Sequence, residues 1–201
     1  MKTVIVTGLI GSGKSAVCAL LRKQGIPVYN ADEKTKFLYD THPSLVTQLE
    51  DALGLSLRGT DGRLDRPRLA SRIFSDAASR ETVEGIVYPL VLADFRAWRS
   101  AQEGAPFVVL ESAVILTKPL FDGLADAAVL VTAPEDVRLQ RVMARDGLPE
   151  DAVRARMRAQ EIPEDKVDVT LVNDGDAARL EQAVEQVFFQ NNSYLCKILN
   201  K

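Results

Sequence analysis

At 201 residues, the chain is long enough for one folding unit that carries insertions. Its formal net charge of −3 excludes a global basic field that would draw it onto nucleic acid or an anionic membrane surface, so any anion must be bound locally. A basic leader and a run of about 18 apolar residues are both missing from the sequence, so we expect a cytoplasmic protein. Cys18 and Cys196 belong to no CxxC or His-rich motif, which favours reduced structural thiols over a disulfide framework or a zinc site.

Five short apolar runs bounded by turn residues predict β-strands. They are TVIVT (3–7), IPVYN (26–30), PFVVLES (106–112), AAVLVT (127–132) and VTLVN (169–173). Near-continuous apolarity over about five residues is typical of strands that are buried on both faces of a parallel sheet. Because helical stretches separate the runs, the pattern predicts an α/β fold around a five-stranded parallel sheet.

A glycine-rich octapeptide, GLIGSGKS at residues 8–15, directly follows the first predicted strand. It matches the pattern G-x-x-x-x-G-K-[ST] and precedes a helical stretch, which is the context in which this pattern binds nucleotide phosphates. Backbone N–H groups of such a loop and the positive end of the following helix bind phosphate oxygens, and glycine lets the anion approach the backbone. A glycine-rich turn that matches by chance is the alternative.

The motif predicts individual roles within this phosphate loop (residues 8–15). We expect Lys14 to reach the β- and γ-phosphates of ATP, and the Ser15 hydroxyl to ligate Mg²⁺. The residues expected to bind ATP in this part of the chain are Gly8, Gly11, Ser12, Gly13, Lys14, Ser15 and Ala16.

Two helical insertions interrupt the predicted core. The first separates the second and third strands by roughly 75 residues, far more than the 10 to 15 of a crossover helix. The second follows the fourth strand, where Thr132 and Glu135 predict a capping-box start, Gly147 the end of one helix and Pro149 the start of another. The predicted division is a core of 1–34, 104–133 and 166–201, an inserted helical lobe at 35–103, and an arginine-rich helical lid at 134–165.

The last predicted helix covers about 176 to 188. Its apolar residues Leu180, Val184, Val187 and Phe188 form one stripe, which we expect to pack on the sheet. Residues 189–201 give no clear signal.

Arginines recur at helical spacing in the predicted hairpin. Arg138, Arg141 and Arg145 share a face of its first helix, and Arg154 and Arg158 share a face of the second. A solvated charged face is the alternative, balanced by Glu135, Asp136, Glu150 and Asp151. The chain carries no N-K-x-D motif of a GTPase and no LSGGQ-like signature of an ABC ATPase, so its layout favours a small-molecule kinase with an acceptor lobe and a lid.

Several segments together resemble the dephospho-CoA kinase family, from residue 1 to about residue 188. These segments are VTGLIGSGKSAV, GIPVYNADEKTKFLY, IVYPLV, LVTAPEDVRLQRVMARDGLPEDAVRARMRAQ and VNDGD. The resemblance implies a P-loop NTPase three-layer core and an enzyme that uses ATP and Mg²⁺ to phosphorylate the ribose 3′-hydroxyl of dephospho-CoA. The implied partners are these two small molecules, without nucleic acid or membrane, and the implied assembly is a monomer or small homo-oligomer. A kinase of another small acceptor and a nucleotide-binding module without turnover are the alternatives.

The resemblance also implies roles for residues outside the phosphate loop. Asp32, after the second strand, corresponds to the family's acceptor-side aspartate, which orients and deprotonates the hydroxyl in a catalytic set with Lys14 and Arg141. Capping of the following helix is the other role open to Asp32. Arg141 and Arg145 match arginines that close over ATP. Asn173 and Gly175 belong to a loop that contacts adenine, and the same NDGD stretch also reads as an ordinary turn.

The chain departs from the family pattern mainly on the acceptor side. Glu111 ends the third strand, where the family usually has an aspartate; we expect it to hold Mg²⁺ through water or to line the acceptor site, and a capping or surface role is the alternative. Tyr88 replaces the family histidine, and we expect it to bind substrate as a hydrogen-bond donor without positive charge. Asn30 replaces a carboxylate, and His42 is given no family role.

Overall fold

The structure, a computed structural model, describes residues 1–42 and 44–199 in two compact units. The core unit comprises Met1–Asn30 and Ala101–Lys201, and the helical unit comprises Ala31–Ser100. The acceptor role predicted for 35–103 and the lid role predicted for 134–165 stay predictions, and the latter segment belongs to the core unit in this division. Residue 43 of the predicted lobe and residues 200–201 of the predicted core lie outside the described residues.

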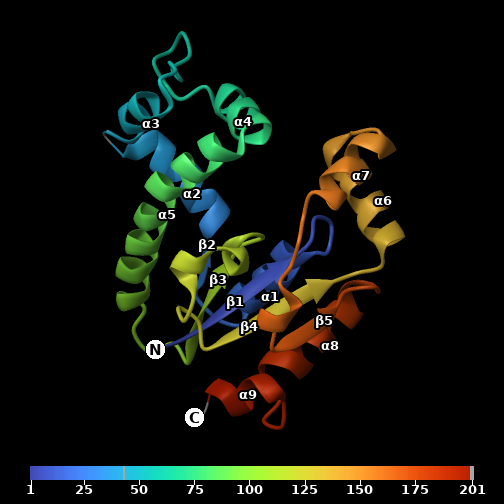
Figure 1. The fold of residues 1–201 in the computed structure, drawn as a ribbon. Helices are drawn as coiled ribbons and strands as arrows, with labels where there is room; N and C mark the ends of the chain where they lie inside the picture. The colour runs from blue at the N-terminus through green and yellow to red at the C-terminus, as the bar shows by residue number, and fades with distance from the viewer. Residues whose placement is uncertain (43, 200–201) are drawn as a thin grey trace. The chain divides into compact units, whose positions relative to one another are not determined.

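The core unit is built on a parallel sheet of five strands in the order β2-β3-β1-β4-β5 (Figure 1). The strands are β1 (Lys2–Gly8), β2 (Val28–Asn30), β3 (Phe107–Glu111), β4 (Ala127–Thr132) and β5 (Val169–Val172). Each lies within or overlaps one of the five apolar runs, so the predicted α/β fold with a five-stranded parallel sheet is confirmed. Because β1 is central, with Val6 beside Glu111 of β3 and Gly8 beside Val131 of β4, the phosphate loop leaves the sheet between these two neighbours.

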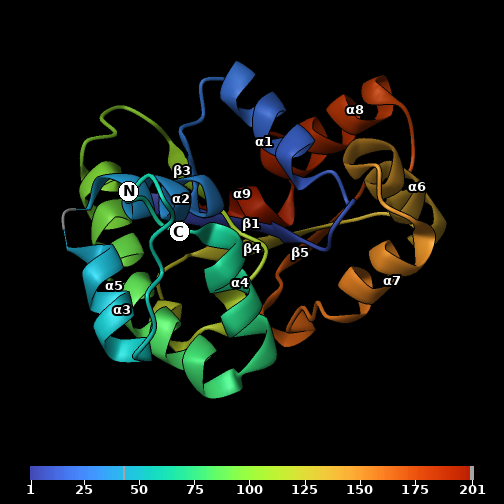
Figure 2. The ribbon, with the colours of Figure 1, turned by 90° about the horizontal axis from the view of Figure 1, so that it is seen from above.

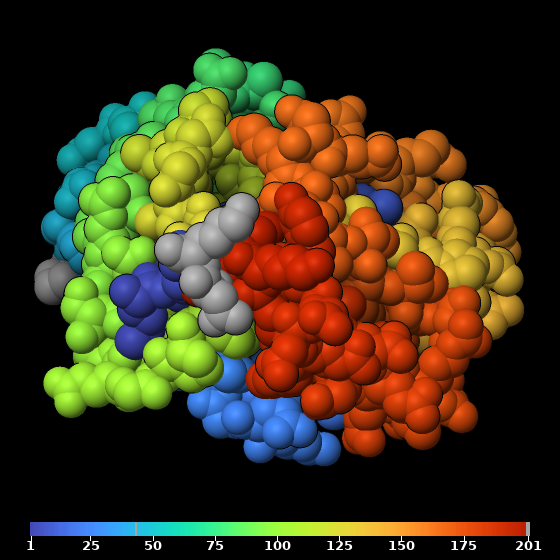
Figure 3. All heavy atoms as spheres, turned by 90° about the horizontal axis from the view of Figure 1, so that it is seen from below, coloured from blue at the N-terminus to red at the C-terminus, as the bar shows by residue number. Residues whose placement is uncertain are grey.

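One face of the sheet is covered by α1 (Lys14–Lys23), α8 (Ala177–Phe188) and α9 (Tyr194–Leu199). In α8, Leu180, Val184 and Phe188 are buried and Val187 is partly buried against the same core, as the apolar stripe predicts. The helix starts where the Asp176 carboxylate accepts a hydrogen bond from a backbone N–H of its first turn. The C-terminal segment that carries α8 and α9 forms a continuous surface, red in Figure 3.

The arginine hairpin (residues 134–165) consists of α6 (Glu135–Asp146), α7 (Glu150–Arg158) and the 3₁₀ turn η3 (Glu164–Lys166), with α6 and α7 side by side (Figure 2). Gly147 ends α6 in the left-handed conformation, as predicted. The predicted capping box is wrong, because α6 begins after Pro134 without a side-chain cap. Thr132 is instead the last residue of β4, where pairing with β5 keeps it extended and its carbonyl accepts the Asn173 N–H at 2.7 Å.

The helical unit consists of α2 (Ala31–Thr41), α3 (Leu45–Leu53), α4 (Arg66–Ser75) and α5 (Ala77–Ser100). The first three all pack against the long α5 (Figure 1). The buried side of α5 carries Val83, Val87, Val91 and Phe95, a spacing of four residues that places them on one helical stripe. Within the described parts of the chain, no helix combines the length and apolar character needed to cross a bilayer.

The two short 3₁₀ turns η1 (Ile115–Thr117) and η2 (Pro119–Phe121) complete the core unit. They connect β3 to β4 and bury Ile115 and Phe121. A chain segment after β3 is therefore fixed by packing, which holds the carboxyl end of that strand in place.

Candidate active site

The phosphate loop connects the end of β1 to the start of α1. Gly11 and Gly13 have φ angles of +79° and +90°, a region that residues with a side chain rarely adopt. A Cβ atom added at Gly11 would lie 2.5 Å from the backbone oxygen of Arg138, and one at Gly13 would collide with the amide nitrogen of the Asn173 side chain. The loop therefore needs glycine for its backbone path and for the close approach of its neighbours.

A buried carboxylate lies beside the loop. Glu111, the last residue of β3, is 2% exposed, and its Oε1 accepts hydrogen bonds from the Ser15 hydroxyl at 2.9 Å and from Lys14 Nζ at 3.3 Å. Its Oε2 lies 3.9 Å from Nη2 of Arg22. A buried charge is stable only when it is paired, and here two cations supply the pairing. The surface role considered for Glu111 is wrong, because the sheet register carries this side chain inside.

The face of α1 toward Glu111 extends beyond the phosphate loop. Cys18 and Arg22 follow Lys14 at intervals of four residues, so all three lie on one helical face. Burial and, next, the negative charge of Glu111 raise the pKa of the Cys18 thiol, which keeps it neutral. Both cysteines are free thiols, as predicted. Sequence reasoning missed Arg22, although its spacing from Lys14 was a usable signal.

Asn173 joins three separate segments of the core unit. It follows β5, is 5% exposed, and donates from Nδ2 to the carbonyl oxygen of Ser12 at 2.8 Å. Its own carbonyl accepts a hydrogen bond from Arg141 Nη1 at 3.1 Å. The structure therefore brings together the phosphate loop, Asn173 and Arg141, which the sequence placed far apart. Gly175 lies in the turn before α8, where a Cβ would collide with the Arg179 side chain.

The other arginines of the hairpin have different surroundings. Arg145 forms two hydrogen bonds with the adjacent Asp146, at 2.7 and 3.0 Å, and these lower the pKa of that carboxyl. Arg154 bonds Glu150 and Glu135 at the surface, as the solvated-face alternative holds. Arg138 is buried and donates from Nε to the Ala133 carbonyl. The ATP contact predicted for Arg145 stays a prediction.

A side chain that sequence reasoning left without a role also contacts the phosphate loop. Gln160, quoted above only as part of the segment RMRAQ, accepts a hydrogen bond from the Ile10 N–H with its Oε1 at 2.6 Å. The loop position Ile10 is a free one in the nucleotide-binding pattern, so no rule about that pattern links it to a residue 150 positions later.

The predicted acceptor-side residues Asp32 and Tyr88 both belong to the helical unit. The helix α2 begins at Ala31, one residue before Asp32. Asp32 is therefore an exposed residue of the first helical turn and does not occupy the predicted capping position. The Tyr88 hydroxyl lies 3.4 Å from Oε1 of Glu84. Burial, then the Glu84 charge, raise the pKa of Tyr88, and the Asp32 charge adds a smaller effect in the same direction. Tyr88 is therefore a neutral phenol that can donate a hydrogen bond.

The described residues contain no cluster of three or more His, Cys, Asp or Glu side chains arranged to hold a metal. Mg²⁺ usually keeps several waters and takes one or two protein ligands together with substrate phosphates. Ser15 and Glu111, joined by their 2.9 Å hydrogen bond, fit that requirement as the residues that would hold it.

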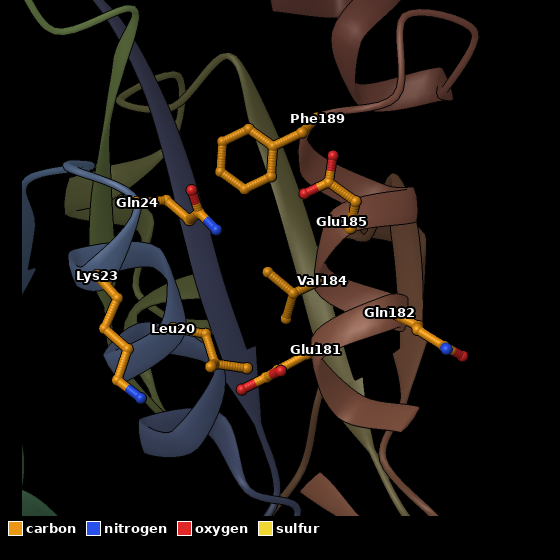
Figure 4. A pocket seen from close by; sticks show the side chains of 8 residues that line it. All are labelled: Leu20, Lys23, Gln24, Glu181, Gln182, Val184, Glu185 and Phe189. Carbon is orange, nitrogen blue, oxygen red and sulfur yellow. The ribbon is translucent and has the colours of Figure 1, made fainter. Parts of the chain in front are cut away.

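A separate hollow of about 360 Å³ lies between α1 and α8 (Figure 4). Leu20, Val184 and Phe189 face into it. Leu20 and Lys23 belong to the last turns of α1 and Gln24 directly follows that helix, whereas the phosphate loop adjoins its first turn. This hollow is therefore separate from the candidate site.

Comparisons with known proteins identify the family of this chain. A family model described as dephospho-CoA kinase matches residues 2–179. A dephospho-CoA kinase of Porphyromonas gingivalis is 42% identical over 161 residues, covering 80% of this chain and 78% of that protein. One of Bacteroides fragilis is 34% identical over 200 residues, covering 97% of each.

Among solved structures, TT1252 from Thermus thermophilus is 36% identical, with a TM-score of 0.78 over 92% of this chain and 94% of that one. Dephospho-CoA kinase from Campylobacter jejuni, at 23% identity, shares the fold with a TM-score of 0.64 over 93% of this chain and 96% of that one. Because a family model spans most of the sequence, and relatives are 42% and 34% identical over 80% and 97% of it, the chain belongs to the dephospho-CoA kinase family.

Proposed function

We propose that this protein transfers the terminal phosphoryl group of Mg·ATP to the ribose 3′-hydroxyl of dephospho-CoA, giving coenzyme A and ADP in the last step of coenzyme A biosynthesis. The observation that carries this proposal is the contact of Lys14 and Ser15 with the buried Glu111 in a chain that matches the family over residues 2–179. These three side chains are the ones that phosphoryl transfer needs around the phosphates and the metal.

In the proposed reaction, residues of the core unit bind the phosphates of ATP and the metal. Backbone N–H groups of the phosphate loop and the N-terminus of α1 hold the phosphates, and Lys14 neutralises charge on the β- and γ-groups. Ser15 ligates Mg²⁺, which supplies charge neutralisation to the transferring group when bound. The hydrogen bond between Ser15 and Glu111 supports a metal-side role for Glu111, holding Mg²⁺ through water, over a role in lining the acceptor site.

Arg141 and the NDGD turn serve the nucleotide. The Arg141 guanidinium is anchored on Asn173, whose amide is itself anchored on the phosphate loop, so its positive charge is positioned to offset phosphate charge. Asn173 and Gly175 present backbone to adenine. Arg145 reaches ATP only after it leaves Asp146.

Asp32 and Tyr88 serve the acceptor. As the 3′-oxygen attacks the γ-phosphorus, the hydroxyl proton passes to the Asp32 carboxylate, the bond from the γ-phosphorus to the bridging oxygen breaks, and ADP leaves. The neutral Tyr88 phenol, whose one O–H now donates to Glu84, donates a hydrogen bond to the acceptor once it leaves that carboxylate. Support for this pair is their electrostatic coupling within one unit and the family position of Asp32.

Release of ADP from Mg·ATP, measured with different acceptors, tests the proposed function. Dephospho-CoA should stimulate release, whereas AMP, shikimate and adenosine should not. Stimulation by AMP alone would replace the proposal with a nucleoside monophosphate kinase. No stimulation by any acceptor would leave a nucleotide-binding module.

The base is tested separately by Asp32→Asn, with Glu33→Gln in the same exposed turn as the matched control. Loss of the proton acceptor should lower kcat by about 10²- to 10⁴-fold while ATP affinity stays within twofold. The control should keep wild-type turnover. An unchanged kcat in Asp32→Asn would remove Asp32 from the mechanism.

A further inference from the structure

The phosphate loop is tied to the arginine hairpin by one side-chain amide. Gln160 lies two residues beyond Arg158, the last residue of α7, and its Oε1 accepts the Ile10 N–H at 2.6 Å. The hydrogen bond is short and joins segments 150 residues apart. It is therefore a tertiary contact of the site rather than part of local helix termination.

Apolar packing holds the Ile10 partner of this bond in place. The Ile10 side chain packs against the small core of the hairpin, which is formed by Leu139, Val142 and Val153. The next loop residue, Gly11, approaches the backbone of α6 so closely that a Cβ there would lie 2.5 Å from an oxygen. The loop segment that donates this hydrogen bond is therefore packed directly against the hairpin.

The hydrogen-bonding partner also fixes the orientation of the amide. Because Ile10 offers an N–H, the carboxamide oxygen must face it, and the planar amide then holds the NH₂ group next to the loop as well. Within residues 1–42 and 44–199, this Nε2 group makes no hydrogen bond, and Gln160 is only partly buried. Two donors are therefore available at the rim of the phosphate loop.

The way in which a phosphate loop binds a nucleotide indicates which group of ATP these two donors would contact. Backbone N–H groups of such a loop cradle the α- and β-phosphates, and the lysine reaches the β- and γ-phosphates, so the terminal group extends beyond the cradle. In the transition state its equatorial oxygens carry spread negative charge. Along the chain, Ile10 lies nearer to the end of β1 at Gly8 than to the start of α1 at Lys14, and its own N–H is already used by Gln160.

We propose that Gln160 is a further substrate-contacting residue of the phosphotransfer site: Oε1 stays on the Ile10 N–H while the NH₂ group donates to the terminal phosphoryl of ATP. The inference rests on the proposed function in that it needs a bound nucleoside triphosphate. It predicts that Gln160 distinguishes ATP from ADP, because ADP lacks the group that the amide contacts. A neutral donor adds this contact without placing another fixed charge in the hairpin.

Three variants separate the donor from the link to Ile10. Gln160→Glu keeps an oxygen for the Ile10 N–H but removes the donors and adds a negative charge, and Gln160→Met removes both functions at similar length. Gln186→Glu, at an exposed position of α8, is the control for added charge. Affinities for Mg·ADP and for a non-hydrolysable Mg·ATP analogue are measured by calorimetry, together with the thermal midpoint of each variant.

We expect Gln160→Met to bind the ATP analogue about tenfold more weakly, since hydrogen bonds to charged groups are the strong ones, with ADP affinity changed less than twofold. Gln160→Glu should lose more affinity for the analogue than Gln160→Met, and Gln186→Glu should match the wild type. Equal losses for both nucleotides, or wild-type binding of the analogue by Gln160→Glu, would show a link to Ile10 alone and overturn the proposal.

A different measurement, turnover of dephospho-CoA, tests the proposed function itself. If the wild type binds both nucleotides but makes no coenzyme A from dephospho-CoA, the acceptor assignment is wrong and the binding ratio still decides the role of Gln160. If turnover is present, Gln160→Met should lower kcat while the KM for dephospho-CoA stays within twofold.

Discussion

The phosphate loop and the arginine hairpin both carry cations beside the candidate site, but these cations acquire their neighbours in different ways. In the loop, closely spaced glycines give the backbone a tight path, and Lys14 and Ser15, which directly follow the last glycine, both contact Glu111. In the hairpin, arginines at equivalent helical spacing have different neighbours: Arg141 bonds Asn173, whereas Arg145 and Arg154 bond surface carboxylates. A contiguous motif thus predicts a site, whereas periodic charges predict only a helical face.

The largest expected effect comes from breaking the loop with Gly13→Ala. The new methyl group would collide with the Asn173 amide in addition to straining a φ of +90°, so nucleotide affinity should fall about 100-fold or more. Gly25→Ala is the matched control, because Gly25 has a φ of +79° but nothing within 4 Å of an added Cβ. The control should lose about 1–2 kcal/mol of folding stability and no affinity.

Isothermal titration with ADP and thermal unfolding measure both effects of these glycine variants. Equal affinities in the two variants would mean that the loop tolerates a methyl group at Gly13 despite the collision with Asn173. That result would weaken the contrast between loop and hairpin, because the loop would then not depend on glycine at this position.

Next in size is Glu111→Gln, which tests whether the loop depends on a charge from β3. The amide keeps the volume and accepts from Ser15, but it removes the negative charge facing Lys14 and Arg22. We expect turnover to fall on the order of 10²-fold and the Mg²⁺ concentration for half-maximal rate to rise. Glu185→Gln on the exposed side of α8 is the control. A lower thermal midpoint with unchanged Mg²⁺ dependence would make Glu111 a structural residue only.

A smaller effect distinguishes arginines within the hairpin. Arg141→Ala should raise the KM for ATP about tenfold, because it removes a guanidinium anchored at the site. Arg154→Ala should leave that KM within twofold, because Arg154 bonds only exposed carboxylates. Steady-state kinetics of both variants check the pair, and similar KM values would show that the hairpin acts through its overall charge.

The smallest effect concerns the thiol beneath the loop. Burial and the Glu111 charge raise the pKa of Cys18, so at pH 8 it stays a neutral thiol, and the thiolate is the reactive form. Iodoacetamide should therefore modify the partly buried Cys196 first and reach Cys18 only on unfolding. Mass spectrometry of peptides from the folded protein measures this order. Equal labelling of both cysteines would show that the layer between α1 and β3 opens readily.

The sequence by itself determined the parts that depend on neighbouring residues. Apolar runs near Val4 and Val129 predicted buried parallel strands, the spacing from Gly8 to Ser15 predicted the phosphate loop, and Gly147 predicted a helix end. Each follows from backbone conformation or from burial of a contiguous segment, which a short stretch of sequence specifies.

Only the tertiary structure decided which distant residues meet. Sheet register placed Glu111 against Ser15 and made Thr132 a strand residue rather than a helix cap, and hairpin packing set Gln160 on Ile10. Local propensity is silent on such pairs, because their energies depend on strand order and on packing between segments that lie from 40 residues apart, as for Thr132 and Val172, to 150 residues apart, as for Ile10 and Gln160. For the same reason, equally spaced arginines acquired different partners.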